Sequence, residues 1–167
     1  MSRKSSYNKK DLLEIANGQF IDSSIGKLPL PPMLMIDRII EISEDGGKYG
    51  KGRIEAELDI DESLWFFHCH FKNDPVMPGC LGLDALWQLT GFNLGWRGLK
   101  GRGRALGVSE VKFKGMVTPS TKLVKYEINF SRVLDRKLKL GISDGKVFAD
   151  GEEIFVAKGL KVGLFEN

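Results

Sequence analysis

The two histidines of this chain lie close together in an aromatic run, residues 65–71 (WFFHCHF). His68 and His70 are two positions apart, so in an extended segment their side chains point to the same side. An imidazole there is a half-buried packing group, a general base near neutral pH, or a zinc ligand, with Cys80 or Asp74 available as a further ligand. Zinc sites normally contain a second close pair of ligands, and none follows. The pattern therefore favours a base and predicts no metal.

A carboxylate and an amide stand four residues apart downstream. Asp84 and Gln88 share one face of the helix that we predict over residues 78–96. A buried carboxylate is costly unless it is hydrogen-bonded or protonated. Either Gln88 simply satisfies Asp84 in a polar gap, or desolvation keeps Asp84 protonated and ready to donate its proton.

The start of the same helix has a third candidate feature, residues 75–82 (PVMPGCLG). Pro78 suits the first helical position, and Gly79 allows a ligand to approach the backbone closely. The free N–H groups and the positive end of the helix dipole favour a developing negative charge. A Pro-Gly turn that only starts a helix is the alternative. Together the three features predict a base, an oxyanion site and an acid.

The elements that must position these residues follow from hydrophobic periodicity. Apolar and polar residues alternate over 53–60 and again over 124–131, which predicts two strands with one buried face each. We predict further strands at 39–42, 106–114, 137–142, 146–149 and 153–163, hairpin turns at Ser143-Asp144-Gly145 and Asp150-Gly151, and a short helix at 9–17 capped by Asn8 or Ser6.

The helix over 78–96 is apolar nearly all round, so it must be covered on every side. An antiparallel sheet wrapped around this central helix satisfies that requirement. We therefore expect the α+β class and one domain over residues 1–167, since 167 residues suit a single domain.

Composition excludes several classes of protein. The net charge is only +3, and the basic residues are interleaved with acids, which argues against nucleic acid as a partner. The two cysteines, Cys69 and Cys80, imply no disulfide framework. The longest apolar stretch, residues 81–96, is interrupted by Asp84, Gln88 and Asn93 and is short for a membrane span. No secretory signal opens the sequence. We expect a cytoplasmic protein that contacts no membrane.

Residues 70–89 (HFKNDPVMPGCLGLDALWQL) closely resemble the signature of the bacterial β-hydroxyacyl-[acyl-carrier-protein] dehydratases. The resemblance covers essentially the whole chain and includes residues 33–38 (MLMIDR), 104–108 (RALGV) and 160–165 (LKVGLF). Within this family, the sequence most resembles the 3-hydroxydecanoyl dehydratase/isomerase branch. The dehydratase-only branch has a glutamate where this chain has Asp84.

The resemblance implies a hot-dog fold and a homodimer with shared active sites, in which His70 of one subunit meets Asp84 of the partner subunit. It implies a 3-hydroxyacyl substrate in thioester linkage to acyl carrier protein, and no metal or organic cofactor. His70 would be the general base, and Asp84, held by Gln88, would protonate the departing hydroxyl. The Gly79 N–H would stabilise the thioester oxygen. Val76 and Cys80 would support this site.

Two further groups of residues are candidates for substrate and partner binding. Phe71, Trp87 and Phe92 are candidates for the wall of an acyl tunnel, although each could equally pack in the core. The basic side chains that could face the acidic carrier protein are Arg132, Arg136 and Lys137, for which a solvated cluster is the alternative.

His68 departs from the family pattern, in which the residue before Cys69 is usually glycine. We expect it to be a bystander, because His70 is the histidine that precedes the phenylalanine and the double-proline segment. Two other functions remain open. One is a hot-dog thioesterase, in which Asp84 activates water, and the other is a non-catalytic module that binds acyl carrier protein.

Overall fold

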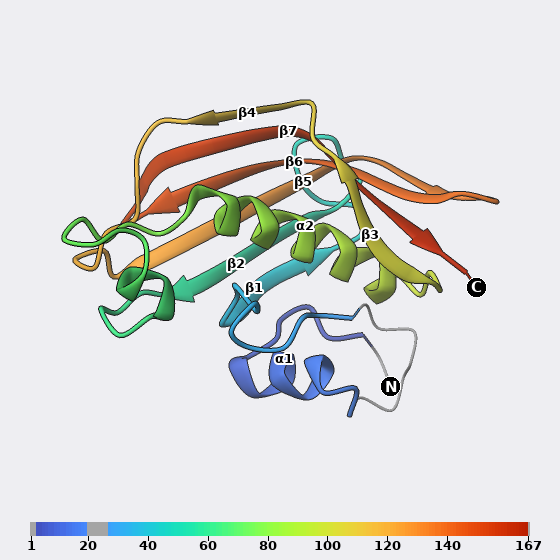
Figure 1. The fold of residues 1–167 in the computed structure, drawn as a ribbon. Coiled ribbons are helices and arrows are strands. Elements are labelled where there is room, and N and C mark those ends of the chain that lie inside the picture. Colours follow the sequence, from blue (N-terminus) through green and yellow to red (C-terminus); the bar gives the residue numbers. More distant parts are fainter. Residues whose placement is uncertain (1–2, 20–26, 167) are drawn as a thin grey trace.

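A long curved sheet encloses the central helix in the computed structural model, which describes residues 3–19 and 27–166. The helices are α1 (Lys9–Ala16), η1 (Trp65–His68, a 3-10 helix) and α2 (Gly79–Trp96), and the strands are β1 (Arg38–Ser43), β2 (Arg53–Asp59), β3 (Arg102–Gly107), β4 (Glu110–Phe113), β5 (Leu123–Asp135), β6 (Lys139–Ala149) and β7 (Glu152–Phe165). The strands form one seven-stranded antiparallel sheet in the order β1-β2-β5-β6-β7-β3, with β4 also paired to β7. Figure 1 shows α2 running across the concave side of this sheet.

The first helix forms where its capping residues predict it. The Asn8 side chain accepts a hydrogen bond from the Asp11 N–H, and the Asp11 side chain accepts one from the Asn8 N–H. This capping box satisfies two N–H groups that a helix start leaves free. Leu12 and Ile15, three residues apart, turn inward and are buried. The helix over 9–17 and its Asn8 cap are thus confirmed.

The alternation in the two longest periodic segments has the consequence that we predicted. Ile54 and Ala56 on β2, like Tyr126 and Ile128 on β5, are fully buried and belong to the core around α2. The outer face between them is charged, and Glu55 lies there within reach of Arg53 and Lys125. One face of the sheet therefore packs on the helix, and the other is solvated.

The close packing of α2 on the sheet depends on two glycines of β6. A Cβ atom on Gly145 would lie 2.7 Å from a methyl carbon of Leu86, and one on Gly141 would lie 3.0 Å from a methyl carbon of Leu94. Real Cβ atoms essentially never come as close as 2.7 Å and seldom as close as 3.0 Å, so the two leucines fill the space that these glycines leave. This contact fixes the height of α2 above the sheet.

We expect Gly145→Ala to lower the free energy of unfolding by about 1–3 kcal/mol, since the added methyl group overpacks the contact with Leu86. Gly103→Ala is the matched control, because its Cβ would meet its nearest neighbour at an ordinary 3.7 Å. Urea denaturation of both variants measures the difference. Equal midpoints for the two variants would contradict this account of the packing.

The predicted hairpin turn at Ser143-Asp144-Gly145 is wrong. One strand, β6, runs through it, so the separate strands predicted at 137–142 and 146–149 are a single strand with a bulge between Ser143 and Gly145. Asp144 lies within the sheet, and its carboxylate accepts hydrogen bonds from the Tyr49 hydroxyl and the Gly159 N–H. An Asp-Gly pair marks a bulge as well as a turn. The reversal between β5 and β6 lies at residues 136–138 instead.

Other boundaries were predicted with smaller errors. The turn at Asp150-Gly151 is confirmed, and both residues have positive φ angles, +48° and +90°, as a tight hairpin requires. The strand predicted over 106–114 is two strands, β3 and β4, because the chain bends between them to pair with different parts of β7. Pro78 is the N-cap of α2, and the helix begins one residue later, at Gly79.

The prediction that α2 is covered on every side is not fulfilled within one chain. A stripe of α2 that includes Asp84, Trp87, Gln88 and Gly91 stays partly exposed. A single curved sheet covers only part of a helix circumference, so this face remains open. Next to the stripe, the outer edge of β3 has no strand partner among the described residues.

An antiparallel sheet wrapped around a long central helix is the hot-dog fold, so the α+β expectation is confirmed. Within the described part of the chain, none of the helices combines the length and the apolar character needed to cross a membrane.

Candidate active site

His70 is held by a short loop that closes on itself between η1 and α2. The Phe71 N–H donates to the Asp74 carbonyl at 2.8 Å, and the Asp74 N–H donates to the Phe71 carbonyl at 3.1 Å. The Val76 N–H then donates to the His70 carbonyl at 2.8 Å. The His70–Phe71 peptide bond is cis. The three hydrogen bonds of this loop bring His70 and Val76 side by side, although the two residues are six positions apart in the sequence.

The contact between His70 and Val76 determines which nitrogen of the imidazole carries the proton. His70 Nδ1 lies 2.8 Å from the Val76 carbonyl oxygen. Because a carbonyl only accepts hydrogen bonds, Nδ1 must carry the proton. In the neutral ring the lone pair is then on Nε2, which is able to take a proton from a substrate. The Val76 carbonyl is thus the group that orients His70, a contact that the sequence analysis did not predict.

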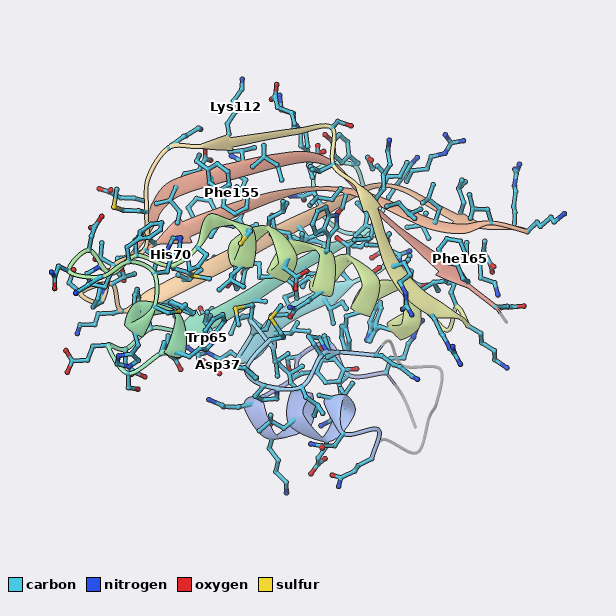
Figure 2. All side chains as sticks on the ribbon, in the orientation of Figure 1. Asp37, Trp65, His70, Lys112, Phe155 and Phe165 are labelled. Carbon is cyan, nitrogen blue, oxygen red and sulfur yellow. The ribbon has the colours of Figure 1, made fainter. Side chains whose placement is uncertain are left out.

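An apolar cavity of about 570 Å³ opens beside His70. It lies between the amino end of α2 and the strands β4 to β7, and Figure 2 shows His70 and Phe155 on this side of the sheet. Its wall includes His70, Val76, Met77, Gly79, Cys80, Leu83, Val111, Phe113, Met116, Val117, Ile154 and Phe155. The arrangement suits an apolar chain whose polar end lies near the imidazole.

Glycines at the start of α2 let the cavity wall approach the helix backbone. A Cβ atom on Gly79 would lie 2.6 Å from the ring of Phe113, and one on Gly82 would lie 2.9 Å from the ring of Phe155. Gly79 and Cys80 are the first two residues of the helix, so their N–H groups have no partner within it. Both residues line the cavity. The positive end of the helix dipole therefore lies beside the cavity that His70 also lines.

Asp84 is held in a separate hydrogen-bond network. Gln88 Nε2 donates to Asp84 Oδ2 at 2.6 Å and to the Met33 carbonyl at 2.8 Å. The Met35 N–H donates to Gln88 Oε1 at 3.2 Å. Both ends of the amide are thus engaged, so its orientation is fixed. The sequence predicted the contact between Gln88 and Asp84 but not the two backbone groups that orient it.

The segment that anchors Gln88 is itself tied to the sheet. Arg38 binds Asp59 through two nitrogens at 2.7 and 2.8 Å and binds Glu57 at 2.7 Å. The hydrogen bonds from Arg38 lower the pKa of Asp59. Asp37 accepts the Asp59 N–H at 2.9 Å. The position of Asp84 therefore depends on a rigid connection from β2 through residues 33–38.

Within one chain, the structure places the predicted acid and the predicted base in different cavities. Asp84, Gln88 and Trp87 line a second cavity of about 670 Å³, which extends to β3, and His70 is not part of its wall. His70, Val76, Gly79 and Cys80 line the first cavity. Each cavity thus contains one half of the predicted catalytic set.

The three predicted tunnel residues lie in three different surroundings. Phe71 is 54% exposed, and its ring stacks on His70 with 3.7 Å between centroids. Trp87 lines the second cavity and donates its Nε1–H to the Gly107 carbonyl. Phe92 is fully buried in the core against Tyr7. The first cavity is instead walled by Phe113 and Phe155, which sequence reasoning missed.

The predicted carrier-protein patch lies on the solvent side of the β5–β6 hairpin. Arg132 is exposed on β5, and Arg136 and Lys137 are exposed in the turn. Arg132 pairs in register with Ile142 of β6, which pairs with Lys161 of β7, so Lys161 extends the patch across the sheet. Lys161 was not predicted as a neighbour of these residues, because it is distant in the chain.

Two remaining predictions concern His68 and metal. His68 is exposed at the end of η1 and lines neither cavity. Over residues 3–19 and 27–166, no three His, Cys, Asp or Glu side chains gather as a metal site would require.

Solved structures with the same architecture come from several organisms. The dehydratase heterocomplex ApeI:P from Xenorhabdus doucetiae superimposes with a TM-score of 0.62 at 15% sequence identity. The alignment covers 82% of this chain and 86% of the matched chain. An uncharacterized protein from Pyrococcus horikoshii has a TM-score of 0.56 at 13% identity, with 80% and 85% coverage. A virulence protein from Campylobacter jejuni has a TM-score of 0.54 at 9% identity, with 92% and 85% coverage. At these identities the likeness shows the fold alone.

The family model goes further than these structures. The model described as FabA-like domain matches residues 28–158 of this chain. The match includes the residues 33–38 that anchor Gln88, the His70 loop, the amino end of α2 and Asp84. Since it spans most of the chain and both halves of the site, this chain belongs to the FabA-like family.

Proposed function

We propose that this chain dehydrates 3-hydroxyacyl thioesters, with 3-hydroxydecanoyl-[acyl-carrier-protein] as its substrate. The observation that supports the proposal most directly is the oriented imidazole. His70 Nδ1 is committed to the Val76 carbonyl, so Nε2 is free to accept a proton at the mouth of an apolar cavity. Family membership supports the same chemistry.

The first step is removal of a proton from C2 of the substrate. His70 Nε2 takes this proton as general base, and the electron pair moves toward the thioester carbonyl. The carbonyl oxygen gains negative charge, which the Gly79 N–H and the positive end of α2 stabilise. The cavity wall holds the acyl chain while C2 stays near the imidazole.

The second step expels the hydroxyl group from C3. Asp84, held by Gln88 at 2.6 Å, gives its proton to the hydroxyl oxygen, and water leaves as the C2–C3 double bond forms. The product is the trans-2-enoyl thioester. For the isomerisation, His70 removes a proton from C4 and returns one to C2, which gives the cis-3 isomer. No oxidation occurs in either reaction, and protons and electrons balance without a cofactor.

A homodimer with shared sites reconciles this mechanism with the separation of His70 and Asp84. Each chain offers a base beside one cavity and an acid beside another, so neither cavity is complete alone. The open stripe of α2 around Asp84 and the unpaired edge of β3 would be covered by a second copy. His70 of one subunit would then face Asp84 of the partner subunit.

The carrier protein would dock on the basic patch of Arg132, Arg136, Lys137 and Lys161. None of the four has a carboxylate within 4 Å among the described residues, whereas cations such as Lys125 and Lys146 elsewhere on the sheet are paired. An unbalanced positive surface attracts an acidic partner and speeds its association.

Charge reversal tests this patch. We expect Arg132→Glu/Arg136→Glu to lower kcat/KM about tenfold or more on the carrier-linked substrate, because both association and orientation depend on these charges. The same variant should retain its activity on an N-acetylcysteamine thioester, which has no carrier. Unchanged activity on the carrier-linked substrate would contradict docking at this patch.

Product analysis tests the proposed function itself. The protein is incubated with 3-hydroxydecanoyl thioester, and the products are identified by gas chromatography. Trans-2 and cis-3 decenoyl products together support the bifunctional enzyme, and the trans-2 product alone removes the isomerase step. Free acid indicates the thioesterase, in which Asp84 activates water. Unchanged substrate with a folded dimer supports the non-catalytic carrier-binding module.

A further inference from the structure

The second cavity has an unusual distribution of charge. Among the described residues, four cations line it, Lys27, Lys100, Arg102 and Arg104, and Asp84 is the one carboxylate in its wall. The side chains of Lys100, Arg102 and Arg104 are exposed, and none of them has an ion-pair partner within 4 Å in the described part of the chain. Their positive charges therefore gather along one part of the cavity wall.

Several cations elsewhere on the molecule are paired with carboxylates. Lys146 and Lys114 share Glu153, and Arg38 binds two carboxylates. Lys139, which lies next to the cavity and donates to the Lys100 carbonyl, is paired with Glu166. Other exposed cations, such as Lys51 and Lys122, are also unpaired among the described residues, but they line neither cavity, whereas the cations at residues 100–104 gather in the wall of one.

The cluster also lies between the basic docking patch and the proton donor. β3, which carries Arg102 and Arg104, pairs with the end of β7, so Arg104 is opposite Gly163, two positions from Lys161 of the patch. On the other side, the cavity wall continues to Asp84 and Gln88. Figure 2 shows Phe165, the register partner of Arg102, at the end of the sheet away from His70.

We propose that Lys100, Arg102 and Arg104 bind the phosphate of the phosphopantetheine arm that carries the acyl group, as the arm passes from the carrier protein into the cavity at Asp84. This inference rests on the proposed function and adds a ligand site to it. The arm has a single charged group, its phosphate, and that group lies where the arm joins the carrier protein. A phosphate bound at this position places the thioester deeper in the cavity. Guanidinium groups suit phosphate because they donate paired hydrogen bonds to its oxygens.

The test compares thioesters that differ only in the phosphate. The same 3-hydroxydecanoyl group is attached to 4′-phosphopantetheine and to pantetheine, so that neither substrate has a carrier protein. We expect Arg102→Gln/Arg104→Gln to lower kcat/KM for the phosphorylated substrate by about tenfold to a hundredfold, because hydrogen bonds to a charged group are lost. On the pantetheine thioester the variant should equal the wild type.

Two further variants serve as controls. Lys51→Gln/Lys122→Gln removes the same number of charges from exposed positions that line neither cavity, and it should leave both substrates unaffected. Arg102→Lys/Arg104→Lys keeps the charge and should retain most of the preference for the phosphorylated substrate. An equal loss on both substrates, or no loss on either, would overturn the phosphate site.

Failure of this inference differs from failure of the proposed function. A wild-type protein that turns over neither thioester contradicts the dehydratase and leaves the phosphate site to a binding measurement. Isothermal titration of 4′-phosphopantetheine and pantetheine into wild type and Arg102→Gln/Arg104→Gln then decides. Binding that requires both the phosphate and the arginines supports the site, and equal binding of the two compounds contradicts it.

Discussion

His70→Ala is expected to lower turnover of a 3-hydroxyacyl thioester by about 10²–10⁴-fold, the range that positioned general bases contribute. The alanine cannot take the C2 proton, and no other imidazole lines the cavity. Because His70 is only partly buried at the mouth of the cavity, the variant should fold normally. Steady-state kinetics together with circular dichroism measure the two properties.

The matched control is the neighbouring imidazole. His68→Gly should keep turnover within about tenfold of the wild type, since His68 is exposed and lines neither cavity. It also restores the residue usual in the family. The opposite ranking of the two variants would transfer the role of base to His68 and refute the assignment.

Mixing two inactive variants should restore activity. In the shared-site dimer, His70→Ala and Asp84→Asn each inactivate both sites of their own homodimer. A heterodimer of the two has one site with both mutations and one with neither. Random assortment therefore returns about a quarter of the wild-type sites, against a background reduced by orders of magnitude.

Co-expression of the two variants with different affinity tags allows the heterodimer to be isolated and assayed. Tandem purification followed by kinetics gives the activity per heterodimer, expected at about half the wild-type value because one of two sites is intact. An isolated heterodimer with no more activity than its parents would show that acid and base act within the same chain.

Much of the fold was predictable because its signals are local. Period-two alternation on β2 and β5 and the Asn8 cap of α1 each depend on a few neighbouring residues. The error at Ser143-Asp144-Gly145 has the opposite origin. Here the Asp-Gly pair lies at a bulge within β6, and Leu86 fills the space above Gly145, a contact between residues that are distant in the sequence.

The residues of the candidate site also fall into those predictable from local sequence and those placed by tertiary packing. His70, Gly79, Asp84 and Gln88 were found because their spacing and residue types carry chemical meaning. The cavity wall was not, because Phe113 and Phe155 come from strands whose register against the start of α2 is set by tertiary packing. Nor does periodicity distinguish Phe92, which packs on Tyr7, from a residue that lines a tunnel.

The fixed amide of Gln88 has a consequence for stereochemistry. Because Gln88 donates to one oxygen of Asp84, the other oxygen is the natural place for the transferable proton, and its direction is constant. In the proposed mechanism the apolar cavity would fix the direction of the acyl chain, and the imidazole would fix the position of C2. Three fixed points in a chiral pocket distinguish mirror images. Only one enantiomer at C3 would present its hydroxyl to that oxygen, so the enzyme would be enantioselective without any contact dedicated to that purpose.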